Sequence, residues 1–504
     1  MARVTGRAAG LRYDLLVVGG GINGAGIARD AAGRGLRVLL CERDDLASHT
    51  SSASTKLIHG GLRYLEHREF MLVRKSLMER EVLIEAAPHI IWPLRFVMPH
   101  DDHLRPRWMI RAGLFLYDHL ARRRRLPGSA AIDLRRHVAG TPLDPRFTRG
   151  FVYSDAWVED SRLVVLNAMD AAERGATVLT RTAFTGARRT GDGWLATLQP
   201  QGGAAMTVEA RALVNAAGPW VGSVLDGVLH RESARQVRLV KGSHIIVPRI
   251  FDHEFAYIFQ NPDRRIIFAI PYERDFTLIG TTDLEYHGDP ARVAIAADET
   301  RYLCGMADRY FRKPIRPEDV VATYSGVRPL LDDESTDPSS VTRDYSLELE
   351  AGDAPLLSVF GGKITTFRRL AEEAVERLAP ALGVSRGPWT SGVPLPGGDM
   401  PGADFTAFER SLELSYPWLP APLRHRYARA YGTRIGPLLG GGRSLADLGA
   451  PLAPGLYPAE VNYLREHEFA RTAQDILWRR SKLGLHLACD TAATLDGWLA
   501  THPA

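Results

Sequence analysis

The chain has 504 residues, of which 45% are apolar and 24% are charged, and its formal net charge is +4. This length is too great for one hydrophobic core, so we expect two or three domains of ordinary globular composition. The mild positive charge is compatible with anionic substrates or an anionic membrane surface, but it is not the strong basic bias of a nucleic-acid-binding protein. Three separated cysteines without a CxxC pair indicate neither a disulfide framework nor a zinc site, and they fit a reducing compartment.

The first predicted unit is a βαβ motif over residues 13–46. We expect a buried strand over 15–18, a helix over 22–34 and a second strand over 36–41. The apolar stretch before the glycines is too short for a signal peptide, so we interpret it as the first strand. No apolar run in the chain reaches the roughly 18 residues that a membrane-spanning helix needs.

The rest of the chain alternates between helical and strand patterns. Residues 65–87 predict a helix, and residues 265–283 predict two strands around a charged turn. Residues 355–380 return to a strand, a glycine turn and a helix. Residues 387–402 are rich in Gly and Pro and are a candidate linker, so we expect residues 403–504 to form a separate helical domain.

Three glycines of the first βαβ unit form the pattern GxGxxG, between the strand and the helix. Gly19 permits a tight turn, Gly21 lets the backbone approach a pyrophosphate, and Gly24 lets the helix pack on the strand. The N-terminus of the helix then faces the negative charge. Glu42, at the end of the second strand, can hold both ribose hydroxyls and would repel a 2′-phosphate, which disfavours NADP. The pattern predicts a dinucleotide site, and the alternative is a tight turn in an ordinary α/β sheet.

This glycine pattern does not distinguish FAD from NAD. Two further glycine turns, over residues 212–220 and 360–366, each follow a predicted strand. Three returns of the chain to glycine turns suit a long, two-part cofactor that lies across the sheet. Each of the later turns, taken alone, is equally compatible with an ordinary βα connection.

Eight motifs occur in one order along the chain: GGGINGAGIARDAAGRGL, SSASTKLIHGGLRYLEH, LVNAAGPW, KGSHIIVP, IGTTD, YSGVRPL, TRDY and FGGKITT. Together they closely resemble the FAD-dependent (aerobic, respiratory) glycerol-3-phosphate dehydrogenases. The resemblance extends from about residue 13 to the C-terminal domain, which is nearly the whole chain.

The resemblance implies an α/β fold: a glutathione-reductase-like, FAD-binding Rossmann domain with an interleaved β-sheet substrate domain, followed by a C-terminal all-α domain. We expect an oxidoreductase core over residues 1–390 and a helical cap over residues 391–504. Within the core, we expect FAD-binding segments at about 12–95, 150–235 and 320–385, and substrate-domain segments at about 96–149 and 236–319.

The resemblance also implies an activity and its partners. Family members oxidise sn-glycerol 3-phosphate to dihydroxyacetone phosphate, in glycerol and glycerophospholipid catabolism, and pass the electrons to a membrane quinone. We therefore expect a cytoplasmic enzyme, a homodimer, bound peripherally to the anionic cytoplasmic face of the inner membrane. Residues 105–125 combine arginines with large apolar side chains and match an interfacial membrane segment best. A solvated or dimer-facing helix is the alternative.

In this family, the segment that corresponds to residues 51–61 passes close to the flavin ring and the pyrophosphate. Its small side chains and paired glycines permit that approach. The expected FAD contacts are Gly19, Gly21, Ile22, Asn23, Gly24, Glu42, Ser51, Ser52, Thr55, Lys56, His59, Gly60, Gly61, Ala217, Gly218, Trp220, Gly362, Lys363 and Thr365.

The substrate of this family carries a dianionic phosphate, which a bidentate guanidinium binds well. By the family pattern we rank Arg328 first as its ligand, followed by Arg63 and Arg343, and we expect Tyr64 to point toward the substrate. The alternative for each arginine is a salt bridge, for instance between Arg343 and Asp344.

Oxidation of a secondary alcohol by hydride transfer to the flavin also requires a base for the hydroxyl proton. His244 is the first choice, because imidazole titrates near neutrality, although a single histidine is more often structural. Lys363 precedes a helix and could stabilise negative charge on the reduced flavin, hold the substrate phosphate, or simply be solvated. Thr281, Thr282 and Asp283 are expected to shape the pocket.

Three other functions were compatible with parts of the sequence. One is a flavin oxidase for amines or hydroxy acids, and a second is a glycerol-3-phosphate oxidase that differs only in using oxygen as acceptor. The third is an RNA-binding dinucleotide module, which the short arginine run and the lack of an RNP-like motif disfavour. No residue pattern has the spacing of metal ligands, and the expected chemistry needs no metal.

Overall fold

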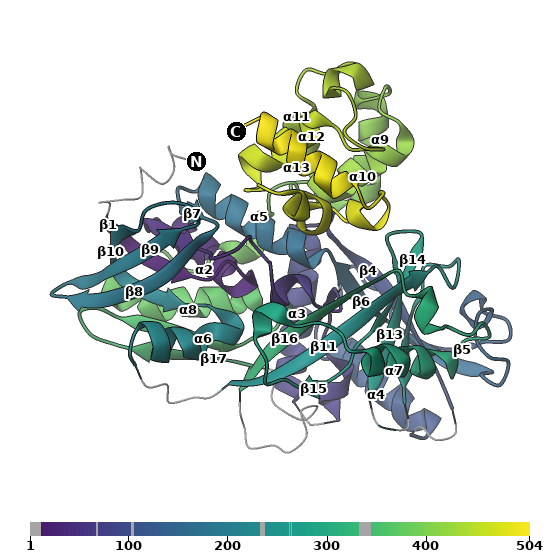
Figure 1. Cartoon of the computed structure of the whole chain (residues 1–504). Helices are drawn as coiled ribbons and strands as arrows, with labels where there is room; N and C mark the ends of the chain where they lie inside the picture. Colours follow the sequence, from purple (N-terminus) through teal and green to yellow (C-terminus); the bar gives the residue numbers. More distant parts are fainter. Residues whose placement is uncertain are drawn as a thin grey trace.

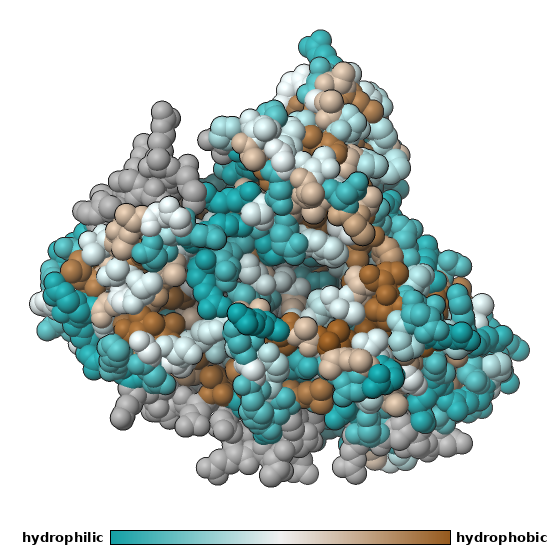
Figure 2. Space-filling model, viewed as in Figure 1, coloured by the Kyte–Doolittle hydropathy of each residue, from teal (hydrophilic) through white to brown (hydrophobic). Residues whose placement is uncertain are grey.

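The structure is a computed structural model that describes residues 12–66, 69–101, 105–231, 237–261, 263, 265–331 and 344–503. Two β-sheets lie side by side in the larger part of the molecule, and the C-terminal helices, drawn in yellow and yellow-green, stand above them (Figure 1). The face of the molecule in this view is mostly hydrophilic, with hydrophobic residues in scattered groups (Figure 2).

The first sheet has the strand order β17-β18-β10-β1-β2-β7, with β9 paired to β10 and β8 paired to β9. The strands β18, β10, β1, β2 and β7 are parallel, so the turns after their carboxyl ends gather at one edge. The strands are β1 (Arg12–Val18), β2 (Val38–Cys41), β7 (Thr177–Leu179), β8 (Thr182–Thr190), β9 (Gly193–Pro200), β10 (Met206–Asn215), β17 (Tyr345–Glu350) and β18 (Leu356–Gly361).

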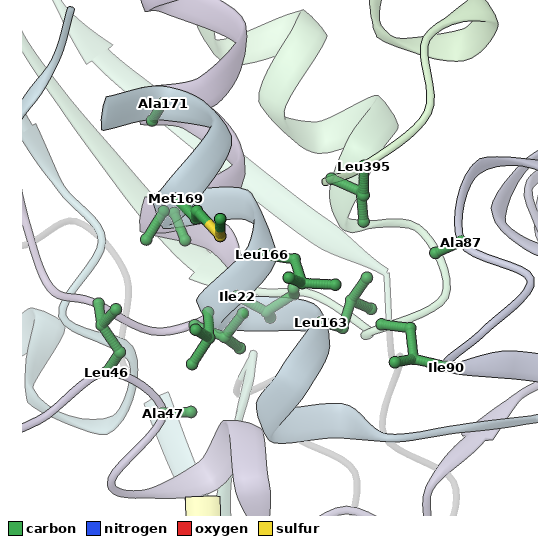
Figure 3. Close-up of a cluster of buried hydrophobic side chains, with 14 of the residues drawn as sticks. Ile22, Leu46, Ala47, Ala87, Ile90, Leu163, Leu166, Met169, Ala171 and Leu395 are labelled. Carbon is green, nitrogen blue, oxygen red and sulfur yellow. The ribbon is translucent and has the colours of Figure 1, made fainter. Parts of the chain in front are cut away.

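Helices α2 (Ile22–Gly33), α5 (Asp160–Glu173) and α8 (Phe367–Leu382) pack together beside this sheet. Strand β1 is covered on both faces, which explains its continuous apolar run over Leu15–Val18. The close-up in Figure 3 shows Leu163, Leu166 and Met169 of α5 gathered with Ile22 and Leu46 in this core. The expected βαβ unit is therefore confirmed, with a shorter second strand.

The second sheet has the order β15-β11-β14-β13-β12-β4-β6-β3, with β16 on β11 and β5 on β6, and its pairs are antiparallel except β4 with β12. The strands are β3 (Leu57–Ile58), β4 (Ile91–Pro99), β5 (Ala130–Asp133), β6 (Arg149–Val158), β11 (Val237–Pro248), β12 (Ala256–Gln260), β13 (Ile266–Tyr272), β14 (Phe276–Gly280), β15 (Leu284–Glu285) and β16 (Ala322–Leu331). The predicted strand pair over 265–283 corresponds to β13 and β14.

Helix α7 (Ala297–Asp308) covers one face of the second sheet, and α3 (Phe70–Ala86) and α4 (Arg107–His119) contribute to the core on the other. The helix predicted over 65–87 begins later than expected, because residues Leu62–Leu65 form a separate 3-10 turn. A short helix, α6 (Val221–Ser223), follows β10.

The C-terminal helices are α9 (Phe405–Ser415), α10 (Ala421–Tyr431), α11 (Ile435–Leu439), α12 (Pro458–His467) and α13 (Thr491–Thr501). Their apolar residues belong to the same continuous core as α2, α5 and α8. The helical pattern after α12 is interrupted at Phe469, whose φ of +62° is left-handed, and a π-helix follows over Asp475–Arg480. The candidate linker over 387–402 is itself packed, since Leu395 and Met400 are buried.

Buried ion pairs join the C-terminal helices to the core. Arg162 of α5 forms a two-pronged pair with Glu468, and its second amino group also donates to the carbonyl of Ala430 at 2.6 Å. On the C-terminal side, Arg480 pairs with Asp45, in the loop after β2. The cap therefore rests on the FAD-binding part through both apolar and charged contacts.

Candidate active site

A cavity of about 540 Å³ lies where the two sheets meet. Its wall combines the turns after β1, β10 and β18 of the first sheet with side chains from β11 and β16 of the second. The long loop after β2 contributes much of the remaining wall, including most of residues 47–64. This edge of a parallel sheet is where α/β folds bind dinucleotides.

The first glycine turn has the geometry that its sequence predicts. Gly19 has a φ of +108°, and a β-carbon there would lie 2.5 Å from the carbonyl oxygen of Ala216. A β-carbon at Gly24 would overlap the carbonyl oxygen of Gly19, so α2 could not approach the turn as closely with any other residue. Gly21, Ile22 and Asn23, at the N-terminus of α2, line the cavity.

Glu42 and Ser51 surround this turn. The buried Glu42 carboxylate accepts hydrogen bonds from the backbone N–H groups of Gly20, at 2.6 Å, and Asp44, at 2.8 Å. Burial raises the pKa of Glu42, and these two backbone bonds oppose the rise. The Ser51 hydroxyl accepts from the N–H of Ile22 at 3.0 Å, at the first turn of α2.

The third glycine turn closes over the same helix end. Gly361 and Gly362 both have left-handed φ values, of +70° and +102°, and Asn23 of α2 donates to the carbonyl of Gly361 at 3.2 Å. The next residue, Lys363, has its ammonium 3.6 Å from the ring centre of Tyr64. The segments FGGK and GGLRY therefore meet in the cavity. The family resemblance implies that both contact the cofactor or the substrate.

Asp160, the first residue of α5, anchors the loop over 51–61. Its fully buried carboxylate accepts from the N–H of Ser54 at 3.2 Å, from the Ser54 hydroxyl at 2.8 Å and from the ammonium of Lys56 at 2.7 Å. Further along, the N–H of His59 donates to the Thr365 hydroxyl at 3.2 Å, which ties the loop to the third glycine turn.

Most of the predicted FAD contacts line the cavity. These are Gly19, Gly21, Ile22, Asn23, Glu42, Ser51, Thr55, His59, Gly61, Ala217, Gly218, Trp220, Gly362, Lys363 and Thr365.

Four predicted contacts lie behind the wall instead. Gly24 packs on the first turn, and the N–H of Gly60 donates to the Tyr117 hydroxyl at 2.8 Å. Ser52 and Lys56 line a neighbouring cavity of about 480 Å³. Ser52, Lys56 and Gly60 therefore lie on the side of the loop that faces away from the cavity, and Gly24 supports the first glycine turn.

His244 reaches the main cavity from β11. Its Nε2 lies 3.0 Å from the Thr55 hydroxyl, and its ring stacks on Tyr324 of β16, with centroids 4.7 Å apart and planes inclined by 18°. Gly280 of β14 is the cross-strand partner of His244, and a β-carbon at Gly280 would overlap the imidazole. The imidazole therefore has room only because residue 280 is glycine.

The pKa of His244 lies well below its usual value. Burial is the largest cause, and the positive charges of Lys56 and Arg328 add to it. An imidazole in this environment is neutral at physiological pH, which is the state that a proton acceptor requires.

Arg328 of β16 also lines the cavity and is engaged by a carboxylate. Its guanidinium donates to Asp283 at 2.5 Å and to the carbonyl of Thr282 at 3.0 Å. A β-carbon at Gly242 would overlap the guanidinium, so this glycine of the KGSH motif makes room for it. Arg328 therefore forms a salt bridge with Asp283, and both residues line the cavity. This salt bridge is compatible with the predicted role of Arg328 in phosphate binding.

Arg63, Tyr64 and Lys363 line the cavity with Arg328 and His244. Thr281 and Asp283 line it too, as expected, whereas Thr282 is buried beside it. The remaining candidate, Arg343, lies outside the residues that the structure describes.

Sequence reasoning missed several residues that shape this site. Tyr324 was quoted within YSGVRPL without a role, and Asp160 carries no motif of its own. Gly242 and Gly280 belong to the motifs KGSHIIVP and IGTTD, but the side chains for which they make room, Arg328 and His244, lie on other strands, so no local signal identifies them.

Within the described part of the chain, no helix is long and apolar enough to cross a bilayer. The same residues contain no group of three or more side chains that could hold a metal ion.

The residues around the cavity fit FAD. The N-terminus of α2 in the cavity wall and the closely approaching backbone at Gly19 suit a pyrophosphate, and Glu42 stands where a ribose would lie. Apolar residues of the second sheet, including Phe96 and Phe268, extend the cavity beyond this dinucleotide turn. The cavity thus offers the room and the contacts of a two-part cofactor.

Comparisons with known proteins agree with this geometry. Residues 14–368 match the family described as FAD dependent oxidoreductase, and residues 389–498 match the family described as the C-terminal domain of alpha-glycerophosphate oxidase. The chain is 55% identical to a glycerol-3-phosphate dehydrogenase of Pseudomonas aeruginosa over 494 residues, which cover 97% of this chain and 96% of the relative. It is 54% identical to a D-erythritol 1-phosphate dehydrogenase of Brucella abortus, over 96% of this chain and 97% of the relative.

Among solved structures, the chain is similar to the glycerol-3-phosphate dehydrogenase of Bacillus halodurans complexed with FAD. The TM-score is 0.80 and the identity 26%, over 99% of this chain and 92% of the other. The match includes the C-terminal helices, so the expected fold class is confirmed. The chain belongs to the FAD-dependent glycerol-3-phosphate dehydrogenase family, and its cofactor is FAD.

Proposed function

We propose that this enzyme oxidises sn-glycerol 3-phosphate to dihydroxyacetone phosphate and passes the electrons to a membrane quinone. The observation that carries the proposal is one cavity that joins a dinucleotide cradle to His244 and the cations Arg328, Arg63 and Lys363. When bound, FAD supplies the hydride acceptor.

The side chains divide the remaining work. The cations bind the phosphate dianion, and the planar guanidinium of Arg328 can do so with two parallel hydrogen bonds. His244 is neutral and accepts the hydroxyl proton at Nε2, directly or through the Thr55 hydroxyl 3.0 Å away. Tyr64 and Lys363 stay close together through their cation–π contact and close the cavity on the side of the third glycine turn.

The first test is anaerobic reduction of the purified holoenzyme. We expect glycerol 3-phosphate to bleach the flavin absorbance rapidly, and unphosphorylated glycerol, lactate and glycine to leave it unchanged. Bleaching by an amino acid or a hydroxy acid would instead support the oxidase alternative, and bleaching by glycerol would contradict the role of the phosphate.

A second substrate is worth testing because a relative of almost equal identity is a D-erythritol 1-phosphate dehydrogenase. This phosphate has one more carbon and the same anionic end, so the same cations could bind it. Comparison of kcat/KM for the two phosphates decides between them. A higher value for glycerol 3-phosphate supports the proposal, and a higher value for erythritol 1-phosphate contradicts it.

The acceptor needs its own test, since part of the chain matches a domain named after an oxidase. We expect the substrate-reduced enzyme to reoxidise much faster with a short-chain quinone than with oxygen. Steady peroxide production at a rate that added quinone does not change would identify an oxidase instead.

Helix α4 supports a peripheral position on the membrane. Trp108, Met109, Phe115 and Leu116 are all exposed, by 70%, 38%, 56% and 38%, and their spacing places them on one face. Exposed arginines at 105, 107 and 111 flank this face. Large apolar side chains among basic ones are typical of an interfacial helix.

Internal partners do not distinguish the arginine run over 122–125 from the arginines beside the apolar face of α4, because both sets have them. In the run, Arg123 pairs with Asp118, Arg124 lies 3.4 Å from Glu85, and Arg125 donates to the carbonyls of Gly402 and Ala403. Beside the apolar face, Arg105 lies 3.4 Å from Glu66 and Arg111 donates to the Ser129 hydroxyl at 2.9 Å. The distinguishing feature of α4 is its exposed apolar face. We therefore place the membrane contact on α4 itself, facing the anionic cytoplasmic leaflet.

Binding to anionic liposomes tests this surface. We expect the double variant Trp108→Ser and Phe115→Ser to bind liposomes more weakly and to keep its activity with a soluble acceptor. Leu414→Ser, which replaces an 85% exposed leucine on α9, is the matched control. Equal binding by all three proteins would discard α4. The expected homodimer remains a prediction, which sedimentation analysis can check.

A further inference from the structure

Lys56 is unusual for a lysine in both its burial and its backbone conformation. Its side chain is almost completely buried, at 1% exposure, and its backbone has a φ of +59°, in the left-handed region that favours glycine. Burying an ammonium and holding a non-glycine residue in this conformation both cost free energy. Because strained residues of this kind cluster at functional sites, Lys56 is a candidate for a role in the reaction.

The contacts of Lys56 lead directly to the proposed base. Its ammonium pairs with Asp160 at 2.7 Å, donates to the carbonyl of Ser52 at 3.1 Å and lies 5.1 Å from the ring centre of Tyr324. Tyr324 in turn stacks on His244, and its hydroxyl donates to the carbonyl of Ser54 at 2.8 Å. Tyr324 therefore lies between the positive charge of Lys56 and the imidazole of His244, in contact with both.

We propose that Lys56 is a positioning residue, which acts through Tyr324 to keep the His244 imidazole neutral and in place to accept the substrate proton. The inference rests on the proposed function, in which His244 is the base. Lys56 contacts neither the cavity that binds FAD nor the reacting atoms, so its effect is electrostatic and steric.

Arg328 is the other positive charge that lowers the pKa of His244, and it differs from Lys56 in its position. Arg328 points into the cavity, and the substrate phosphate will neutralise much of its charge when it binds. Lys56 is behind the wall, so its charge persists in the enzyme–substrate complex, reduced only by the permanent partner Asp160. The titratable and charged groups to be considered around His244 are Lys56, Asp160 and Glu159 beyond Tyr324, Arg328 with Asp283, and Arg63 and Lys363 in the same cavity.

The expected direction follows from the charges. A base works only while it is unprotonated, so flavin reduction slows as the pH falls through the pKa of His244. Burial, Lys56 and Arg328 all lower that pKa, which keeps the imidazole neutral to a lower pH. Removal of the positive charge of Lys56 raises the pKa, so the acid limb of the rate profile moves to higher pH.

The experiment measures the limiting rate of flavin reduction at saturating glycerol 3-phosphate, under anaerobic conditions, as a function of pH. The main variant is Lys56→Met with Asp160→Asn, because loss of one partner alone would leave an unpaired buried charge. We expect its acid limb to lie at higher pH than that of the wild type, by less than the loss of an unpaired charge would give, because the Asp160 carboxylate that partly offsets Lys56 is removed with it. Lys56→Gln, with Asp160 retained, should shift the limb in the same direction and serves if the double variant does not fold.

Three further variants make the outcome specific. Lys56→Arg retains the charge and should keep the acid limb of the wild type. Lys482→Met removes another lysine of the neighbouring cavity, which contacts the Ser161 hydroxyl and a backbone carbonyl, and should not move the limb. His244→Asn should abolish the limb.

These outcomes separate the two proposals. An unshifted limb in a folded Lys56→Gln or double variant overturns the role of Lys56. A limb that persists in His244→Asn overturns the assignment of His244 as the base and leaves the substrate assignment to the bleaching test.

Discussion

At the scale of single residues, the site depends on two glycines, at positions where any side chain would collide with a functional group. Gly280 lies opposite His244 in the pairing of β14 with β11, and Gly242 lies under the guanidinium of Arg328. Added β-carbons would overlap the imidazole in one case and the guanidinium in the other. Each glycine therefore controls one functional group, which allows the two roles to be tested separately.

We expect Gly280→Ala to lower the rate of flavin reduction by on the order of 10²-fold, because the imidazole must move by a substantial part of an ångström. FAD content should be unchanged, since Gly280 lies away from the first glycine turn. Stopped-flow measurement of the reduction rate checks this. Gly305→Ala, at a position in α7 with no neighbour within 4 Å, is the control. A wild-type rate in Gly280→Ala would show that His244 does not need its present position.

Gly242→Ala should act on binding instead. Its β-carbon displaces the guanidinium of Arg328, so we expect a higher KM for glycerol 3-phosphate with a smaller effect on kcat. Steady-state kinetics with a soluble acceptor measure both constants. A change in kcat alone would mean that Arg328 does not hold the phosphate in the ground state.

At the scale of elements, the cofactor depends on the close approach of α2 to β1. Gly24 lies on α2 directly over the carbonyl of Gly19, and Gly26 packs on the ring of Phe367 from α8. These contacts set the position of the helix end that faces the pyrophosphate, so a small displacement of α2 opens the FAD cradle.

We therefore expect Gly24→Ala to reduce the FAD content of the purified protein, because its β-carbon would push α2 away from the turn. The flavin-to-protein absorbance ratio, with and without added FAD, measures the effect. Full occupancy and an unchanged FAD dissociation rate would contradict the packing argument.

At the scale of the whole molecule, the C-terminal helices pack closely against the rest of the chain. One apolar cluster extends from α2 and α5 into α10 and α12, and the buried pairs Arg162–Glu468 and Arg480–Asp45 cross the same boundary. The cap therefore stabilises the loop after β2, which contributes to the cavity wall.

Arg162→Met should destabilise the protein by about 3–5 kcal/mol, because it leaves the carboxylate of Glu468 buried without its partner. The thermal unfolding midpoint and the rate of proteolysis within the C-terminal helices report the loss. The double variant Arg162→Met and Glu468→Leu removes both charges and should recover much of the stability. If the double variant were less stable than the single one, groups other than Arg162 would stabilise the buried carboxylate of Glu468.

Features that depend on contacts between residues close in sequence could be predicted, whereas contacts between distant residues could not. The turn at Gly19, the strand–helix–strand order and the turn at Gly361 follow from short segments, and the structure confirms their form. The support of the loop by Lys56 could not be predicted. The same residue, read within its motif, was expected to contact FAD, but its position depends on Asp160, more than a hundred residues away.

By itself, the sequence determined the dinucleotide cradle and the family, because a strand, a glycine turn and a helix encode their geometry within about 30 consecutive residues. It also determined which side chains were candidates for phosphate binding and proton transfer. Only the tertiary structure decided how they are arranged. Thr55, His244, Gly280 and Tyr324 meet because β11 pairs with both β14 and β16, and because α5 holds the loop after β2 against them. Such pairing joins residues far apart in the chain, and no local pattern specifies it.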